Sequence, residues 1–77
     1  MNDARHTEIR QALTLLKDVQ RILETALSEE QDVLDSMPDD LRNDETGQKS
    51  EDTVDALERA ATYCDDLISA CEDALQS

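Results

Sequence analysis

Two cysteines, one histidine and an acidic linker are the features of this 77-residue chain that could support metal or nucleophilic chemistry. Cys64 and Cys71 are seven residues apart, about 10.5 Å along one helix, which exceeds the Cα separation of about 7 Å that a disulfide spans. Both lie on an apolar helical stripe, which favours buried free thiols over metal ligands and leaves a bridge between two chains open. His6 has no cluster of cysteines or acids at ligand spacing around it, so we expect neither catalysis nor metal binding there.

The acidic linker around Gly47 has the composition of a calcium-binding loop but not its order. With Gly47 at the sixth position, Arg42 would stand first and Thr53 twelfth, where a calcium loop needs carboxylates. The sequence also lacks a glycine-rich phosphate loop, a nucleophile elbow and a basic patch with aromatic residues. We therefore expect no enzymatic activity, no cofactor, no metal and no direct binding of nucleic acid.

The composition predicts helices. The chain has one Gly, one Pro, one Tyr, and no Trp or Phe, whereas small β-barrels and sandwiches depend on turn residues and aromatic side chains. No stretch approaches the ~20 apolar residues that cross a bilayer, and the polar start of the chain is unlike a signal peptide. We expect a single all-α domain over residues 1–77 that is soluble, cytoplasmic and not associated with a membrane.

Apolar residues recur at alternating spacings of three and four in two long segments, the pattern of helices that pack along a seam. The pattern predicts a helix over about residues 4–36, a linker over 37–50 and a second helix over about 51–75. In the first segment the predicted seam is Ile9, Ala12, Leu16, Val19, Leu23, Ala26, Glu30, Val33 and Met37. In the second segment the predicted seam is Val54, Leu57, Ala61, Cys64, Ile68, Cys71 and Leu75.

The linker carries signals for ending one helix and starting the next. Pro38 disfavours helical geometry in the preceding residue, so the first helix should end near Ser36. Ser36 and Asp39 are expected to cap one short extra turn, with Leu41 packed against the bundle. Ser50 is the predicted N-cap of the second helix. A connection this short between helices this long implies an antiparallel hairpin.

The apolar positions cover about half of each helix, which is more than one neighbouring helix can bury. Further apolar residues flank the first seam (Leu13, Leu15, Ile22, Leu27 and Leu34) and the second (Ala56, Ala60, Leu67, Ala70 and Ala74). We expect two hairpins to form a homodimeric four-helix bundle with C2 symmetry, while a different partner protein remains the alternative. The residues expected to hold the core and the dimer together are Ile9, Leu16, Val19, Leu23, Leu57, Cys64, Ile68, Cys71 and Leu75.

Charge is distributed unevenly along the chain. Residues 1–28 sum to zero, so the whole net charge of −13 lies in residues 29–77. Several acids of the second helix fall within an arc of about 120° beside the seam, and they form the predicted partner-binding face: Asp55, Glu58, Asp65, Asp66, Glu72 and Asp73. Dimerisation would double the charge, and such a field repels nucleic acid and attracts basic surfaces.

Two functions fit this acidity. One is an inhibitor or interaction module in which carboxylates of the second helix and the linker take the place of phosphates and occupy the basic groove of a nucleic-acid-binding protein. Duplex DNA carries one charge per ~1.7 Å, so a dimer ~45 Å long would match about 26 phosphates. The other is a structural or assembly dimer whose acids provide solubility or adaptation to high salt. Both are non-enzymatic.

The middle of the chain contains three distinctive runs, LDSMPDDLR from Leu34, TGQKSE from Thr46 and VDALERA from Val54. With these runs the chain resembles a group of small uncharacterised helical proteins of bacteria and their phages. The resemblance covers less than half of the chain and contains no catalytic motif. It implies a hairpin with a Met-Pro-acid-x-Leu turn, and a bacterial cell or a phage-infected host cell as the setting. By association with small acidic phage proteins, it also implies a block on host nucleic-acid machinery.

Overall fold

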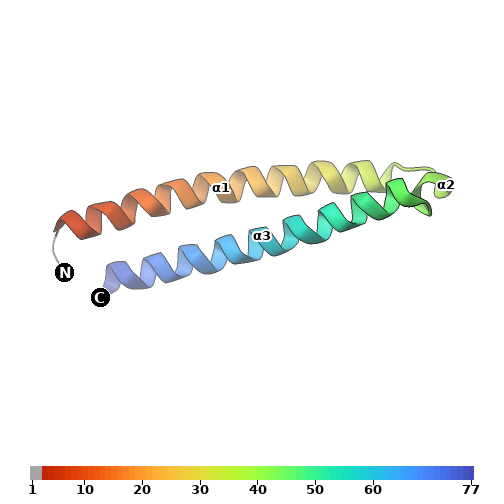
Figure 1. The fold of residues 1–77 in the computed structure, drawn as a ribbon. Helices are drawn as coiled ribbons and strands as arrows, with labels where there is room; N and C mark the ends of the chain where they lie inside the picture. Colours follow the sequence, from red (N-terminus) through yellow and green to blue (C-terminus); the bar gives the residue numbers. More distant parts are fainter. Residues whose placement is uncertain (1–2) are drawn as a thin grey trace.

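The computed structural model describes residues 3–77, which form an all-α hairpin. Helix α1 spans Asp3–Asp35, the short helix α2 spans Asp39–Arg42, and α3 spans Glu45–Gln76. α1 and α3 run antiparallel, α2 lies in the connection at one end, and both termini lie at the other end (Figure 1). The predicted pair of long antiparallel helices with a short turn between them is confirmed.

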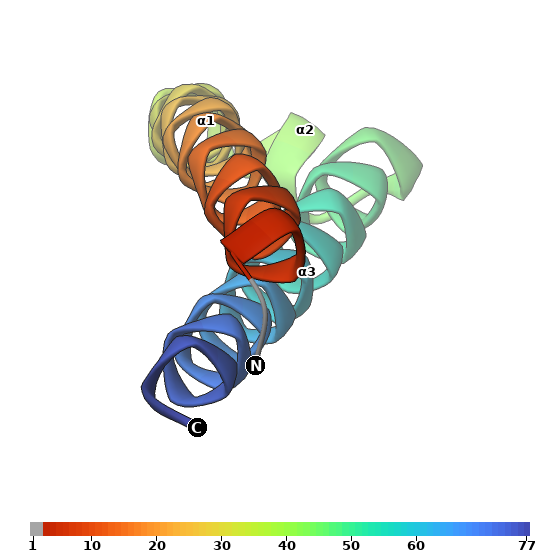
Figure 2. The same ribbon diagram turned by 90° about the vertical axis from the view of Figure 1, so that its left-hand side faces the viewer.

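The hairpin is a single layer of two helices. Its Cα atoms span 59 × 14 × 13 Å, with a radius of gyration of 17.4 Å, against about 11.5 Å for a globular chain of this length. Seen from the terminal end, α1 and α3 lie side by side and cross at an angle, with α2 behind them (Figure 2). Each long helix therefore has one long neighbour, with α2 added at one end of α3, and the rest of its surface faces outward.

The core lies along one contact line between α1 and α3. Leu13, Cys64 and Ile68 are buried at its centre. Half-buried side chains that pack against them are Leu16, Leu23, Cys71 and Leu75. Leu34 and Val54 are buried closer to the α2 end. At 100° per residue, these positions form one continuous stripe on each helix, which we call the seam.

The register predicted for the seam of α1 is partly wrong. Ile9, Leu16 and Leu23 are half-buried in the seam, but Val19 and Val33 are exposed, and Leu13 and Leu34 are buried instead. The reason is that the apolar arc of α1 is wide and α3 covers only one of its edges. On α3 the predicted seam is correct, since Cys64 and Ile68 are buried and Leu57, Cys71 and Leu75 are half-buried.

Polar side chains within the seam are paired across the two helices. Ser50, which is 2% exposed, donates a hydrogen bond from Oγ to Oε1 of Glu30 over 2.7 Å. Gln20 Nε2 donates to Asp65 Oδ1 over 2.5 Å. The Cys64 thiol lies 3.3 Å from the carbonyl oxygen of Leu16. Glu30, which interrupts the apolar pattern of α1, is therefore accommodated by a partner on α3.

The start of α3 also differs from the prediction. The N-cap is Asp44, whose carboxylate accepts a hydrogen bond from the backbone N–H of Thr46 over 2.8 Å. Ser50 lies inside α3, where its side chain is buried in the seam. The prediction missed the first turn of α3 because residues 45–49 are polar and carry no apolar periodicity.

Helix α2 is the extra turn expected after Pro38, but its capping and packing differ. Pro38 is itself the N-cap residue and no side chain caps the turn, so the expected cap by Ser36 and Asp39 is wrong. Leu41 is exposed rather than packed against the bundle. α2 instead packs through its backbone, close to Gly47.

Gly47 is buried in the first turns of α3 and allows α2 to approach closely. A Cβ atom at this position would overlap the carbonyl oxygen of Arg42. Its φ is not positive, so glycine is required here by space rather than by backbone conformation. Gly47 is therefore a point of close contact between α3 and α2 at the turn of the hairpin.

Candidate interaction surfaces

The hairpin brings most of the negative charge to one end. Residues 29–52, which we call the acidic end, include the last turns of α1, all of α2 and the first turns of α3. They contain ten acids against the two bases Arg42 and Lys49, a net charge of −8 out of −13. Lys49 forms an ion pair with Glu45 in its own helix at 3.6 Å. The acidic end is thus the most negative part of the molecule.

The acids at the end of α1 are placed unfavourably with respect to their helix. Asp32 and Asp35 lie in the last turns, and no basic residue is present in the final turn. The C-terminus of a helix carries a partial negative charge, so carboxylates there are destabilising and a nearby cation is stabilising. A basic group bound at this end would therefore relieve repulsion that the isolated chain contains.

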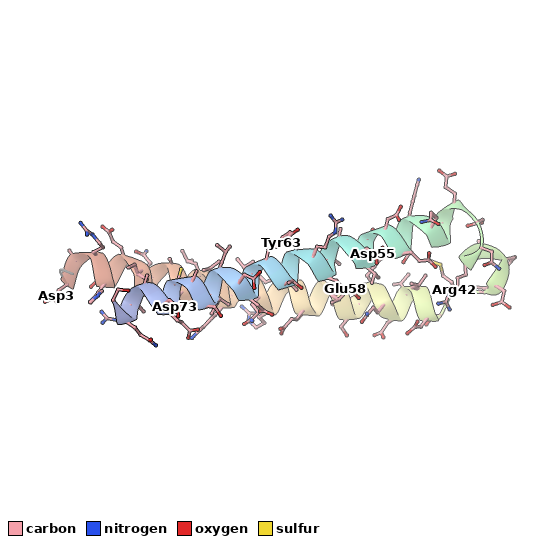
Figure 3. The ribbon with its side chains drawn as sticks, turned by 90° about the horizontal axis from the view of Figure 1, so that it is seen from below. Asp3, Arg42, Asp55, Glu58, Tyr63 and Asp73 are labelled. Carbon is pink, nitrogen blue, oxygen red and sulfur yellow. The ribbon has the colours of Figure 1, made fainter. Side chains whose placement is uncertain are left out.

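The acidic face predicted on α3 is exposed, but its members differ in their surroundings. All six residues are exposed, and Figure 3 labels Asp55, Glu58 and Asp73 along the helix, with Arg42 at the acidic end. Asp65 accepts the hydrogen bond from Gln20 of α1, so it lies at the edge of the face that borders α1. At 100° per residue, Asp55, Asp66 and Asp73 turn further away from α1.

A second surface is apolar and lies beside the seam. It consists of exposed or half-buried residues from both long helices, and we call it the apolar side: Leu15, Val19, Ile22, Ala60, Tyr63 and Leu67. Leu15 and Ile22 are each 58% exposed, Tyr63 63% and Leu67 54%. Alanines continue it toward both ends at Ala12, Ala26, Ala56, Ala70 and Ala74.

Helical geometry places both halves of the apolar side on the same side of the hairpin. When each helix is viewed along its own chain direction, its part of the apolar side is rotated by about 100° from its seam, in the same sense in both helices. Because the helices are antiparallel and their seams face each other, equal rotations bring the two parts to one side. The hydrogen bonds between residues 30 and 50 and between 20 and 65 fix the level of one helix against the other. Leu15 is therefore level with Leu67, and Val19 with Tyr63.

The hairpin exposes more surface than a monomer of its size normally does. Its accessible surface is 5524 Å², whereas a folded monomer of 8.6 kDa is expected to expose about 4,700 Å². The excess is about 800 Å², which equals the share of one partner in a standard protein–protein interface. An extended hairpin with this many exposed apolar side chains favours an oligomer or a partner protein.

The residues with potential for chemistry are not assembled into a centre. Cys64 is buried and Cys71 half-buried, both as free thiols. Among residues 3–77, no group of three or more His, Cys, Asp or Glu side chains is placed to hold a metal ion. His6 lies at a half-buried seam position, where its Nε2 is shielded and has no hydrogen-bond partner.

One shallow, open hollow lies on the outside of α3. It is lined by Asp55, Glu58, Arg59, Thr62 and Tyr63, all from that helix. A hollow formed by little more than two turns of a single helix surface does not enclose a small molecule. Within residues 3–77, neither long helix has a segment apolar enough to cross a membrane.

No known family model, curated protein sequence or solved structure matches this chain. The candidate surfaces therefore rest on the geometry and charge of the chain alone. Sequence reasoning located the excess acid after residue 28 and gave the partner-binding role to the second helix and the linker, with all of its named contacts on α3. The hairpin places the acids of the linker together with those in the last turns of α1 and the first turns of α3.

Proposed function

We propose that this chain is a non-enzymatic protein-interaction module that binds a basic protein surface through its acidic end. The concentration of ten acids against two bases in residues 29–52 is the observation that carries the proposal. A field of this sign raises the local concentration of basic partners and repels nucleic acid. The partner class that fits best is a protein with a basic nucleic-acid-binding groove, which the carboxylates would occupy in place of phosphates.

The end of α1 supports this proposal. A surface acid normally interacts with water at little cost, whereas Asp32 and Asp35 oppose the dipole of their own helix. Binding of arginine or lysine side chains near these carboxylates would remove that repulsion and add charge-assisted hydrogen bonds. The acidic end therefore gains more from a basic partner than an acidic patch in mid-helix would.

A second candidate is a structural or assembly dimer whose acids only maintain solubility. The exposed apolar side favours it, because a surface of this kind is suited to permanent burial against another protein. The two candidates use different parts of the molecule, and salt separates them. Binding through carboxylates weakens steeply as ionic strength rises, whereas apolar packing does not.

The test is capture from a bacterial lysate by tagged protein at about 0.1 M and 0.5 M salt, with duplex DNA as competitor, read by mass spectrometry. Two matched variants each remove four negative charges. The first neutralises the acidic end with Asp32→Asn, Asp35→Asn, Asp39→Asn and Asp40→Asn. The second neutralises the face of α3 with Asp55→Asn, Glu58→Gln, Asp66→Asn and Asp73→Asn.

The proposal expects a nucleic-acid-binding protein that is captured at low salt, displaced by DNA, and lost with the first variant. Loss with the second variant alone would move the site to the face of α3. Recovery of the chain by itself at both salt concentrations would favour the structural dimer.

A further inference from the structure

We infer that the apolar side is the contact surface for a second copy of this chain, and that the two hairpins lie antiparallel, with their acidic ends at opposite ends of a four-helix bundle. The twofold axis would cross the molecule at the level of Val19 and Tyr63. The dimer is shared with the second candidate function, while its residues and its orientation go beyond it. Binding at the acidic end is a separate matter, because those carboxylates lie outside the apolar side.

The position of the apolar side suits a self-complementary contact. Its central pair, Val19 and Tyr63, lies near the middle of the hairpin, since α1 spans Asp3–Asp35. A twofold axis at this level overlays the centre of the apolar side of one copy on that of the other, over Leu15, Val19, Ile22, Ala60, Tyr63 and Leu67. Isologous interfaces of this kind are the commonest form of homodimer. The surplus surface of about 800 Å² per chain also matches a standard interface.

Side-chain volumes favour the antiparallel arrangement at one pair of levels. Leu15 and Leu67 share a level toward the termini, and Ile22 and Ala60 share the matching level on the other side of the axis. A parallel dimer would crowd four leucines at one level, which is destabilising. An antiparallel dimer places Leu15 and Leu67 of each copy against Ile22 and Ala60 of its partner.

Charge selects the same arrangement independently. A parallel dimer would bring two acidic ends of −8 together at one end of the bundle. An antiparallel dimer separates them by most of the 59 Å length of the hairpin, far beyond the screening length of about 8 Å at physiological salt. Each acidic end then lies beside the other end of the partner, and residues 1–28 and 53–77 together carry −5 rather than −8.

The experiment measures the distance between spin labels in the full chain by double electron–electron resonance. The label is attached at Ser36→Cys in a protein that also carries Cys64→Ala and Cys71→Ala. This protein must first be shown to have the helicity and the mass of the native protein. Ser36 lies 17 residues from Val19, so the antiparallel dimer predicts a distance of about 50 Å between labels. A distance below about 25 Å would establish the parallel arrangement, and the absence of any distance between chains would show a monomer. Either result overturns the inference.

A matched pair of variants tests the contact surface, with mass measured by light scattering. Leu67→Asp adds a charge to the apolar side, and Ser69→Asp adds the same charge to the exposed opposite side of α3. We expect native protein and Ser69→Asp at twice the chain mass of 8.6 kDa, and Leu67→Asp at the chain mass or unfolded at the same concentration. A folded Leu67→Asp dimer would overturn the assignment, as would a monomeric native protein.

Discussion

The seam and the apolar side are built from the same residue types at the same spacing, yet one is buried and the other exposed. On α1, Leu13 is 8% exposed and Leu15 58%. On α3, the neighbours Ile68 and Leu67 differ in the same way, at 9% and 54%. The sequence pattern shows which arc of a helix avoids water, and the number of neighbouring helices decides how much of the arc is covered. Part of the apolar surface of this hairpin therefore belongs to its fold, and the rest is exposed and available for association.

The largest expected effect comes from placing a charge in the seam and, in a second variant, on the apolar side. Ile68→Asp puts an unpaired carboxylate into the core beside Cys64 and should cost more than about 4 kcal/mol, which unfolds the chain. Leu67→Asp, one residue earlier, should cost at least about 2 kcal/mol less because the side chain reaches water in the hairpin. Urea unfolding followed by circular dichroism measures both. Equal losses in the free energy of unfolding would show that the seam and the apolar side do not differ in burial.

A smaller effect is expected where α2 meets α3. Gly47→Ala forces a methyl group against the carbonyl oxygen of Arg42, so α2 must move away. We expect a loss of about 1–3 kcal/mol, since the clash outweighs the better helix propensity of alanine. Ser28→Ala, at an exposed position of α1, is the control and should change stability by less than about 0.5 kcal/mol. A gain in stability for Gly47→Ala would show that α2 can shift freely.

The smallest of the three stability effects concerns the polar pair in the seam. Ser50→Ala removes the hydrogen bond to Glu30 and leaves a half-buried carboxylate without this partner. The expected loss is about 1–2 kcal/mol. Ser50→Ala combined with Glu30→Leu should recover most of it, because the seam is then apolar throughout. If the single variant is as stable as the native protein, water replaces the serine hydroxyl and the pair contributes little.

The hairpin was predictable because its signals are redundant. Periodicity, the scarcity of turn residues and Pro38 all indicate two long helices and a tight connection. The start of α3 was not predictable in the same way, because the turn before Ser50 is polar and Asp44 is one of several acids that could act as a cap. The role of Gly47 was not predictable either, because it depends on a contact with α2 that forms only in the folded chain.

The seam of α1 shows a different kind of failure. Val19 fits an apolar seam better than Gln20 by residue type, yet Gln20 lies toward α3, because its amide reaches Asp65. The same holds for Glu30, which looks like an interruption until Ser50 is placed opposite it. Whether a polar residue is accommodated in a seam depends on its partner on the opposite helix. Which residues face each other across the two helices is set by the hairpin as a whole.

Burial of the apolar side by a second copy of the chain should make the stability of the native protein depend on its concentration. Thermal unfolding followed by circular dichroism over a hundredfold range of concentration tests this proposal most directly. Dissociation coupled to unfolding predicts a midpoint that rises with concentration, by about 5–10 °C over this range. A midpoint that stays constant, together with the mass of a single chain, would contradict the proposal and leave the apolar side to a different partner.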